Sequence, residues 1–146
     1  MVDVAELTVA DESVLADLNA LLPQLSSSSP PMTLAALAEM VASDASRLLV
    51  ARNEHGAVLG MLTLVVFRIP TGVRSWIEDV VVDEAARGTG AGAALNRAAI
   101  ALAYDLGAKT IDLTSRPSRV AANALYQKLG FVARDTNIYR HDPTTR

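Results

Sequence analysis

The sequence predicts an α/β (α+β) fold, in which a mixed, mostly antiparallel sheet of six to seven strands is flanked by about four helices. Three observations lead to this prediction. Hydrophobic residues change repeatedly between the period of a strand and that of a helix. Three strand-like segments follow one another in mid-chain, separated by tight turns. With 51% hydrophobic and 20% charged residues, the 146-residue chain can form one core, so we expect a single domain over residues 1–146.

The first part of the chain predicts a strand followed by two helices. Val4–Val9 alternates as a strand does, and Asp11 can cap a helix that runs to about Leu22. Ser26–Pro31 reads as a loop because its serines compete for backbone hydrogen bonds and its paired prolines oppose a helix. Thr33 can then cap a second helix that ends near Ala42.

Three antiparallel strands are expected next. Arg47–Asn53 and Ala57–Ile69 form a predicted hairpin around the turn at residues 54–56. A second turn at residues 70–72 leads to the strand Arg74–Asp83. Its run of three valines, residues 80–82, indicates burial on both faces of the sheet.

The remaining elements alternate between helix and strand. A helix is expected from about Gly90 to Leu106, closed by Gly107, and is followed by the short strand Thr110–Thr114. A last helix should open at Pro117–Ser118, end at Leu129 and be stopped by Gly130. The sequence then predicts two more short strands, Phe131–Ala133 and Asn137–Arg140.

Composition excludes several classes of function. The chain has no cysteine, which rules out a disulfide scaffold, a thiolate nucleophile and sulfur-ligated zinc. Its net charge of −3 provides no basic field for nucleic acid. The longest apolar stretch, Val58–Phe67, is far shorter than the roughly 20 residues that span a bilayer. The acidic N-terminus does not resemble a secretory signal, and His55 and His141 lack metal-ligand spacing, so we expect a cytoplasmic protein without metal, nucleic-acid or membrane partners.

The most informative segment is the glycine-rich loop Arg87–Gly92, between a buried strand and a helix. Alternating glycines let a ligand approach the backbone closely, and the helix N-terminus favours an anion such as a pyrophosphate. A tight turn without a ligand is the alternative. Residues 88–93 also fit the dinucleotide pattern G-x-G-x-x-A, although the loop starts too far from the strand end and on a late strand. A nucleoside-triphosphate P-loop is excluded because no Lys-Ser or Lys-Thr follows the glycines.

Two segments resemble motifs of the GNAT superfamily of acyl-CoA-dependent N-acyltransferases. Asp83–Gly92, after the valine run, is similar to motif A, whose core Arg/Gln-x-x-Gly-x-Gly/Ala is met by Arg87, Gly90 and Gly92. Ala121–Phe131 is similar to motif B, in which an Asn and a Tyr precede Leu-Gly-Phe. The order of the remaining elements agrees with a GNAT-like sheet, so the resemblance covers nearly the whole chain.

The resemblance implies an N-acetyltransferase domain that uses acetyl-CoA as cosubstrate and no metal. A primary amine, on a small molecule or a peptide, would attack the thioester directly in a ternary complex. The absence of cysteine agrees with a mechanism that has no acyl-enzyme, although a serine nucleophile stays open. The resemblance also leaves a homodimer open.

Two side chains are expected to carry the chemistry. The resemblance implies that Tyr126 is the general acid, with its hydroxyl toward the CoA sulfur; a ring buried at the edge of the core is the alternative. Glu78 is the candidate base, since some family members carry the proton-accepting residue at this position. Strand alternation predicts that Glu78 shares a face with Trp76 and Val80, and the neighbouring Ile77 and valines should partly desolvate it. A structural ion pair of Glu78 with an arginine is the alternative.

The resemblance also implies a set of cofactor contacts. Backbone groups of the valine run would bind pantetheine and the thioester carbonyl, and the loop amides would bind the pyrophosphate. Arg119 stands where family members often have an asparagine; it would meet a CoA phosphate, and Asn123 would either bond the cofactor or satisfy helix backbone. The expected cofactor-binding residues are therefore Val80, Val81, Val82, Arg87, Gly88, Thr89, Gly90, Ala91, Gly92, Ala93, Arg119 and Asn123.

Other functions stay open at this point. A non-catalytic acyl-CoA-binding module would have the same loop without a useful base, and a dinucleotide-binding oxidoreductase would use the loop differently. The amine acceptor is expected between the loops at residues 26–31 and 69–73 and the C-terminal strands, with Arg68, Trp76 and Arg116 as candidate wall residues.

Overall fold

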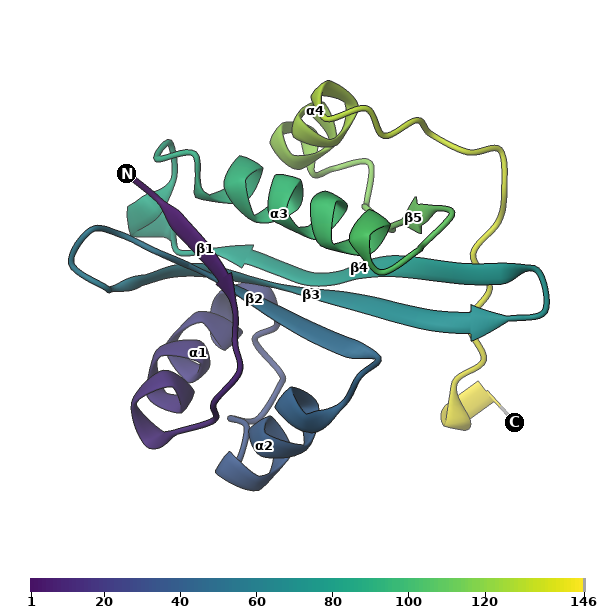
Figure 1. The fold of residues 1–146 in the computed structure, drawn as a ribbon. Helices are drawn as coiled ribbons and strands as arrows, with labels where there is room; N and C mark the ends of the chain where they lie inside the picture. The colour runs from purple at the N-terminus through teal and green to yellow at the C-terminus, as the bar shows by residue number, and fades with distance from the viewer. Residues whose placement is uncertain (146) are drawn as a thin grey trace. The chain divides into compact units, whose positions relative to one another are not determined.

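The structure, a computed structural model, describes residues 1–145. The chain forms two compact units, Met1–Thr114 and Ser115–Arg146. In the described residues, the first unit contains five strands and three α-helices, and the second contains the fourth α-helix (Figure 1). The mixed fold with four helices is therefore confirmed, but the sheet has five strands and the predicted six to seven is wrong.

The sheet follows the order of the chain, β1-β2-β3-β4-β5. Its strands are β1 (Asp3–Glu6), β2 (Ser46–Arg52), β3 (Val58–Ile69), β4 (Gly72–Val82) and β5 (Ile111–Asp112). The first four pair antiparallel, and β5 pairs parallel to β4. The two predicted hairpins around β3 are confirmed, whereas β1 and β5 are shorter than predicted.

Helices cover both faces of the sheet. α1 (Glu12–Leu25) and α2 (Leu34–Ala42) lie on one face, and α3 (Ala91–Asp105) lies on the other (Figure 1). The α1–α2 face encloses an aliphatic core cluster, because each of these helices turns a stripe of leucines toward the strands. This cluster consists of Val14, Leu15, Leu18, Leu21, Leu37, Leu48, Val50, Met61 and Val81. In the described part of the chain, no helix combines the length and apolar character that crossing a membrane requires.

Both predicted N-caps are confirmed. The Asp11 carboxylate accepts the N–H of Val14 at 2.9 Å, and the Thr33 hydroxyl accepts the N–H of Ala36 at 3.1 Å. Each side chain satisfies one of the donors that a helix start leaves unpaired. The two caps therefore fix where α1 and α2 begin.

α1 continues beyond its predicted end. It runs through Pro23 to Leu25, because a proline in the last turn removes only one helical hydrogen bond. The side chain of Asn19 then fastens the far end of the following loop: its amide donates to the Met32 carbonyl at 3.0 Å and its oxygen accepts the Met32 N–H at 2.8 Å. These two hydrogen bonds from Asn19 thus hold the C-terminal end of the loop at residues 26–31 against α1.

The second unit contains α4 (Val120–Lys128) and a 3-10 turn, η2 (Pro143–Thr145). The predicted strands Phe131–Ala133 and Asn137–Arg140 are wrong, since neither segment is a strand. A strand needs a partner for its N–H and C=O groups, and the described residues of this unit provide no other strand. An alternating sequence without such a partner remains irregular.

Candidate active site

β4 contains a bulge at Asp79. Before it, Glu78 pairs with Thr63 of β3; after it, Val81 pairs with Met61. Two residues of β4 therefore stand opposite one residue of β3 between these pairs. Asp79 has a φ of 49°, the only positive φ of a non-glycine residue in the described chain. Such an extra residue bends its strand and shifts the alternation of everything that follows.

The bulge reverses which backbone groups of β4 face β3. Before it, Ser75 donates its N–H to the carbonyl of Thr110, on the side away from β3, at 3.1 Å. After it, Asp83 donates its N–H to the carbonyl of Leu59 in β3 at 2.8 Å. Alternate residues of an antiparallel strand bond to the same neighbour. Odd-numbered residues thus bond away from β3 before the bulge and toward β3 after it.

The C-terminal half of β4 therefore has an open edge. β5 pairs only with Ser75 and Trp76, and no described strand of this unit continues along β4 beyond them. By the register, Val80 and Val82 direct their N–H and C=O groups to this edge, whereas the main chain of Val81 faces β3. The edge can accept an extended ligand as an added strand.

The glycine loop leads from this edge into α3. Gly88 and Gly90 have φ values of 82° and 86°, and a Cβ added at either would meet nothing within 4 Å. Gly90 is the N-cap of α3, without a side-chain cap bond, and accepts the N–H of Ala94 at 3.0 Å. The first N–H groups of α3, from residue 91 to residue 93, have no partner in the described chain. The loop thus combines open space with unpaired donors at the positive end of a helix.

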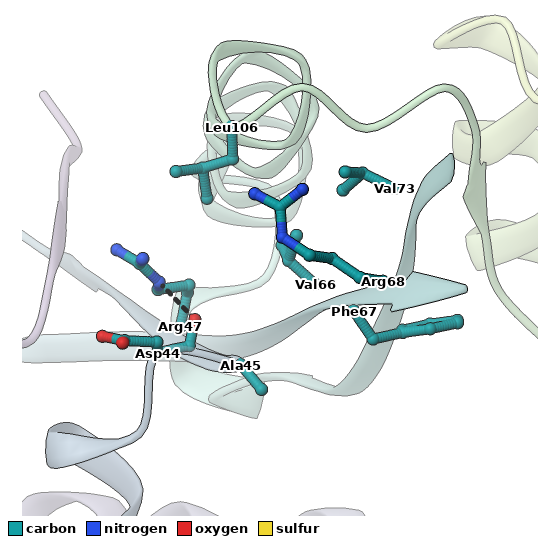
Figure 2. A pocket seen from close by; sticks show the side chains of 8 residues that line it. All are labelled: Asp44, Ala45, Arg47, Val66, Phe67, Arg68, Val73 and Leu106. Carbon is teal, nitrogen blue, oxygen red and sulfur yellow. Dashed lines mark hydrogen bonds between the residues drawn. The ribbon is translucent and has the colours of Figure 1, made fainter. Parts of the chain in front are cut away.

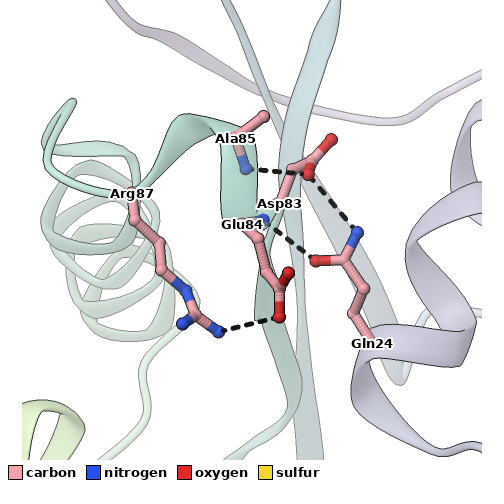
Figure 3. A network of polar contacts seen from close by, with 5 residues as sticks. All are labelled: Gln24, Asp83, Glu84, Ala85 and Arg87. Carbon is pink, nitrogen blue, oxygen red and sulfur yellow. Dashed lines mark hydrogen bonds and ion pairs between the residues drawn. The ribbon is translucent and has the colours of Figure 1, made fainter.

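A polar network fixes the start of this loop (Figure 3). Gln24, at the end of α1, accepts the N–H of Glu84 at 2.9 Å and donates to the carboxylate of Asp83 at 3.3 Å. Asp83 in turn accepts the N–H of Ala85 at 3.1 Å. Gln24 could not be recognised from the sequence, because nothing in the pattern of a last helical turn indicates a hydrogen-bond partner 60 residues away. Arg87 is 72% exposed and pairs with Glu84 at 3.9 Å.

Glu78 is exposed, so the expected desolvation of its carboxylate is wrong. The predicted shared face with Val80 is wrong as well, because the bulge lies between the two residues. Glu78 instead shares the α1–α2 face with Val81. No ion pair of Glu78 with an arginine is present in residues 1–145, which leaves its carboxylate accessible to water.

In the second unit, Tyr126 is 7% exposed and meets Phe131 edge to face, with 5.8 Å between ring centroids. Burial raises the pKa of its hydroxyl above 10.0, and the charge of Arg119 partly opposes this increase. The hydroxyl is therefore protonated at neutral pH. Asn123 donates its side-chain amide to the carbonyl of Arg116 at 3.0 Å, a backbone contact in the loop before α4 and not within the helix itself.

Two candidate wall residues of the acceptor site face opposite ways. Arg68 pairs with Val73, and Trp76 is three residues further along β4. Since side chains alternate along a strand, Arg68 lies on the α3 face and Trp76 on the other. The two cannot line one acceptor pocket together. No group of three or more metal-ligating side chains occurs in the described chain.

Residues 14–131 match the family model of the acetyltransferase (GNAT) family. This match covers most of the chain and includes both sequence motifs. The chain belongs to the GNAT family. The resemblance found in the sequence is thereby confirmed.

Solved structures agree with the GNAT assignment. An acetyltransferase of Trypanosoma brucei is 27% identical, with a TM-score of 0.79, and the match covers 97% of this chain and 99% of that chain. A putative acetyltransferase of Agrobacterium tumefaciens is also 27% identical, with a TM-score of 0.83 and coverage of 96% and 99%. An aminoglycoside N-acetyltransferase solved in complex with CoA shares the fold at 17% identity, with a TM-score of 0.81 and coverage of 98% and 95%. No curated protein matches this GNAT chain significantly.

Proposed function

We propose that this GNAT protein is an acetyl-CoA-dependent N-acetyltransferase in which a primary amine attacks the thioester directly, in a ternary complex. The observation that carries the proposal is a pair of sites with free backbone groups, one at Val80 and Val82 on the open edge of β4 and the other at the first N–H groups of α3. We treat both units as one N-acetyltransferase domain, because the family match extends from residue 14 to residue 131.

The cofactor is assigned to the open edge and the glycine loop. Val80 and Val82 bind the pantetheine arm through N–H and C=O groups, as an added strand would. The amides of Gly88 and of residues 90–93 bind the diphosphate, assisted by the α3 dipole, whereas the N–H of Thr89 is bonded to the Ala86 carbonyl at 3.3 Å. Arg87 adds charge, because its exposed pair with Glu84 is weak enough to exchange for a phosphate. From the second unit, Arg119 contributes a further positive charge.

The reaction needs one proton removed and one supplied. The neutral amine nitrogen forms a bond to the thioester carbon while the C–S bond breaks. Glu78 takes the proton of the amine through water, which its exposure allows. An N–H at the open edge polarises the carbonyl oxygen. Tyr126, kept protonated by burial, donates its proton to the departing thiolate.

The test is thiol release from acetyl-CoA with a panel of primary amines. Tyr126→Phe should reduce kcat on the order of 10²-fold while acetyl-CoA binding persists. Tyr104→Phe is the matched control, because Tyr104 is an exposed tyrosine of α3. Glu78→Gln should lower the rate of acetyl transfer for those amines that need a base to accept their proton. The decrease should be largest at low concentrations of the amine.

Two results would contradict the proposal. If no amine releases thiol although acetyl-CoA at about 100 times its Kd stabilises the fold by roughly 2.7 kcal/mol, the protein is a binding module. If Tyr126→Phe and Glu78→Gln both retain the full rate, the assigned roles are wrong.

A further inference from the structure

A pocket of about 700 Å³ lies at the C-terminal end of α3, the opposite end from the glycine loop (Figure 2). This volume is in the range of small-molecule sites. Figure 2 shows two arginine side chains rising from the sheet on the side of Leu106, with aliphatic side chains around them. The residues that the argument uses are Asp44, Arg47, Val66, Arg68, Val73 and Leu106, of which Asp44 is the one acid beside the two arginines.

The two arginines differ in their partners. Arg47 is held in place: it pairs with Glu6 at 3.2 Å and donates its Nε to the carbonyl of Asp44 at 3.0 Å. Its side chain is 26% exposed. Arg68 has no hydrogen bond or ion pair in the described chain, so its planar fork of N–H donors is free.

The end of α3 does not use these donors. Gly107 donates its N–H to the Tyr104 carbonyl and Ala108 donates to the Ala103 carbonyl, each at 3.0 Å. These two bonds form a Schellman closure, with Gly107 at a φ of 87°. The following backbone therefore satisfies the carbonyls of Ala103 and Tyr104, and no bond from Arg68 to the helix end is present in the described chain.

We propose that this pocket binds the acidic group, a carboxylate or a phosphate, of a small molecule with a short apolar part. Arg68 binds the group through two N–H donors, and Arg47, whose charge is balanced by Glu6, adds from a fixed position the N–H donors that its bonds to Glu6 and Asp44 leave free. The apolar part packs on Val66, Val73 and Leu106. Val73 is seven residues from Val80 along β4, about 23 Å at roughly 3.3 Å per residue, so the pocket is separate from the proposed acetyl-transfer site.

The probes are inorganic phosphate and butyrate, each titrated into the full chain and followed by NMR of backbone amides. Binding at the pocket shifts Val66, Val73 and Leu106, which distinguishes it from phosphate binding at the glycine loop. Tighter binding of butyrate identifies a carboxylate ligand, and tighter binding of phosphate identifies a phosphorylated one.

Arg68→Ala should weaken this binding at least tenfold. Arg74→Ala is the matched control, since Arg74 is on the same hairpin and does not itself line the pocket, although its strand partner Phe67 does. Equal thermal midpoints of the two variants show that neither loses the fold. The proposal is overturned if neither probe saturates these amide shifts, or if Arg68→Ala binds as tightly as Arg74→Ala.

Discussion

Ile77 and Val81 are four residues apart on β4, yet their buried side chains enter opposite faces of the sheet. Val81 belongs to the α1–α2 core cluster, whereas Ile77 pairs with Leu64 on the α3 face. An even spacing on a regular strand would direct both to one face. The bulge at Asp79 makes the difference, and it also turns the main chain of Val80 toward the open edge.

The positive φ of Asp79 predicts a ranking of substitutions. Asp79→Gly should change the free energy of unfolding by less than about 0.5 kcal/mol, because glycine adopts this φ without strain. Asp79→Val should lower it by about 1–2 kcal/mol, because a β-branched residue is strained there. Asp79 is exposed, so lost packing contributes little. Urea unfolding measures both variants, and equal stabilities would show that the bulge imposes no such strain.

Substitutions in the glycine loop should weaken the binding of acetyl-CoA by more than their effect on the stability of the fold explains. Gly90→Ala should raise the Kd for acetyl-CoA at least tenfold, since straining the φ of 86° displaces the amides at the start of α3. Gly130→Ala is the control: Gly130 has a φ of 97° and equally open surroundings, but lies outside the loop. Both variants should lose about 1 kcal/mol of stability. Calorimetric titration checks the prediction, and an equal Kd for the two variants would contradict it.

Gln24 predicts a long-range effect on the cofactor. Gln24→Ala removes the bonds to Glu84 and Asp83, so the loop should be less ordered and the KM for acetyl-CoA should rise about three- to tenfold, with kcat nearly unchanged. Gln127→Ala, at an exposed position of α4, is the control. Steady-state kinetics at saturating amine give both parameters. A fall in kcat alone would assign Gln24 a different role.

The raised pKa of Tyr126 predicts a loss of stability in alkali. Above pH 10.0 the unfolded chain loses the phenolic proton first, while the folded chain retains it. The stability that Tyr126 contributes is thus complete below this pH and declines as the pH rises toward the folded pKa. Urea unfolding at pH values from 9 upward should show a smaller decline in Tyr126→Phe than in Tyr104→Phe. Identical declines would mean that the folded pKa is not raised.

Much of the fold could be predicted from local signals. Asp11 and Thr33 cap their helices because N-capping depends on neighbouring residues alone. The glycine loop was found in the same way, since positive φ angles select glycine.

Features that depend on tertiary partners could not be predicted. The bulge has no glycine or proline to mark it, and a uniform strand period assigned Glu78 to the wrong set of neighbours. The alternation at residues 131–140 indicates strands only where another strand offers its edge. Gln24 meets residues about 60 positions away, which no local pattern reports.

The last two turns of α1 anchor two loops at once. Asn19 holds the segment before α2, while Gln24 holds the connection that leads into α3. A ligand that displaces one of these segments therefore acts on the same short stretch of α1 that holds the other segment in place. If acceptor and acetyl donor bind beside these two segments, as proposed, α1 is the element through which the binding of one would influence the binding of the other.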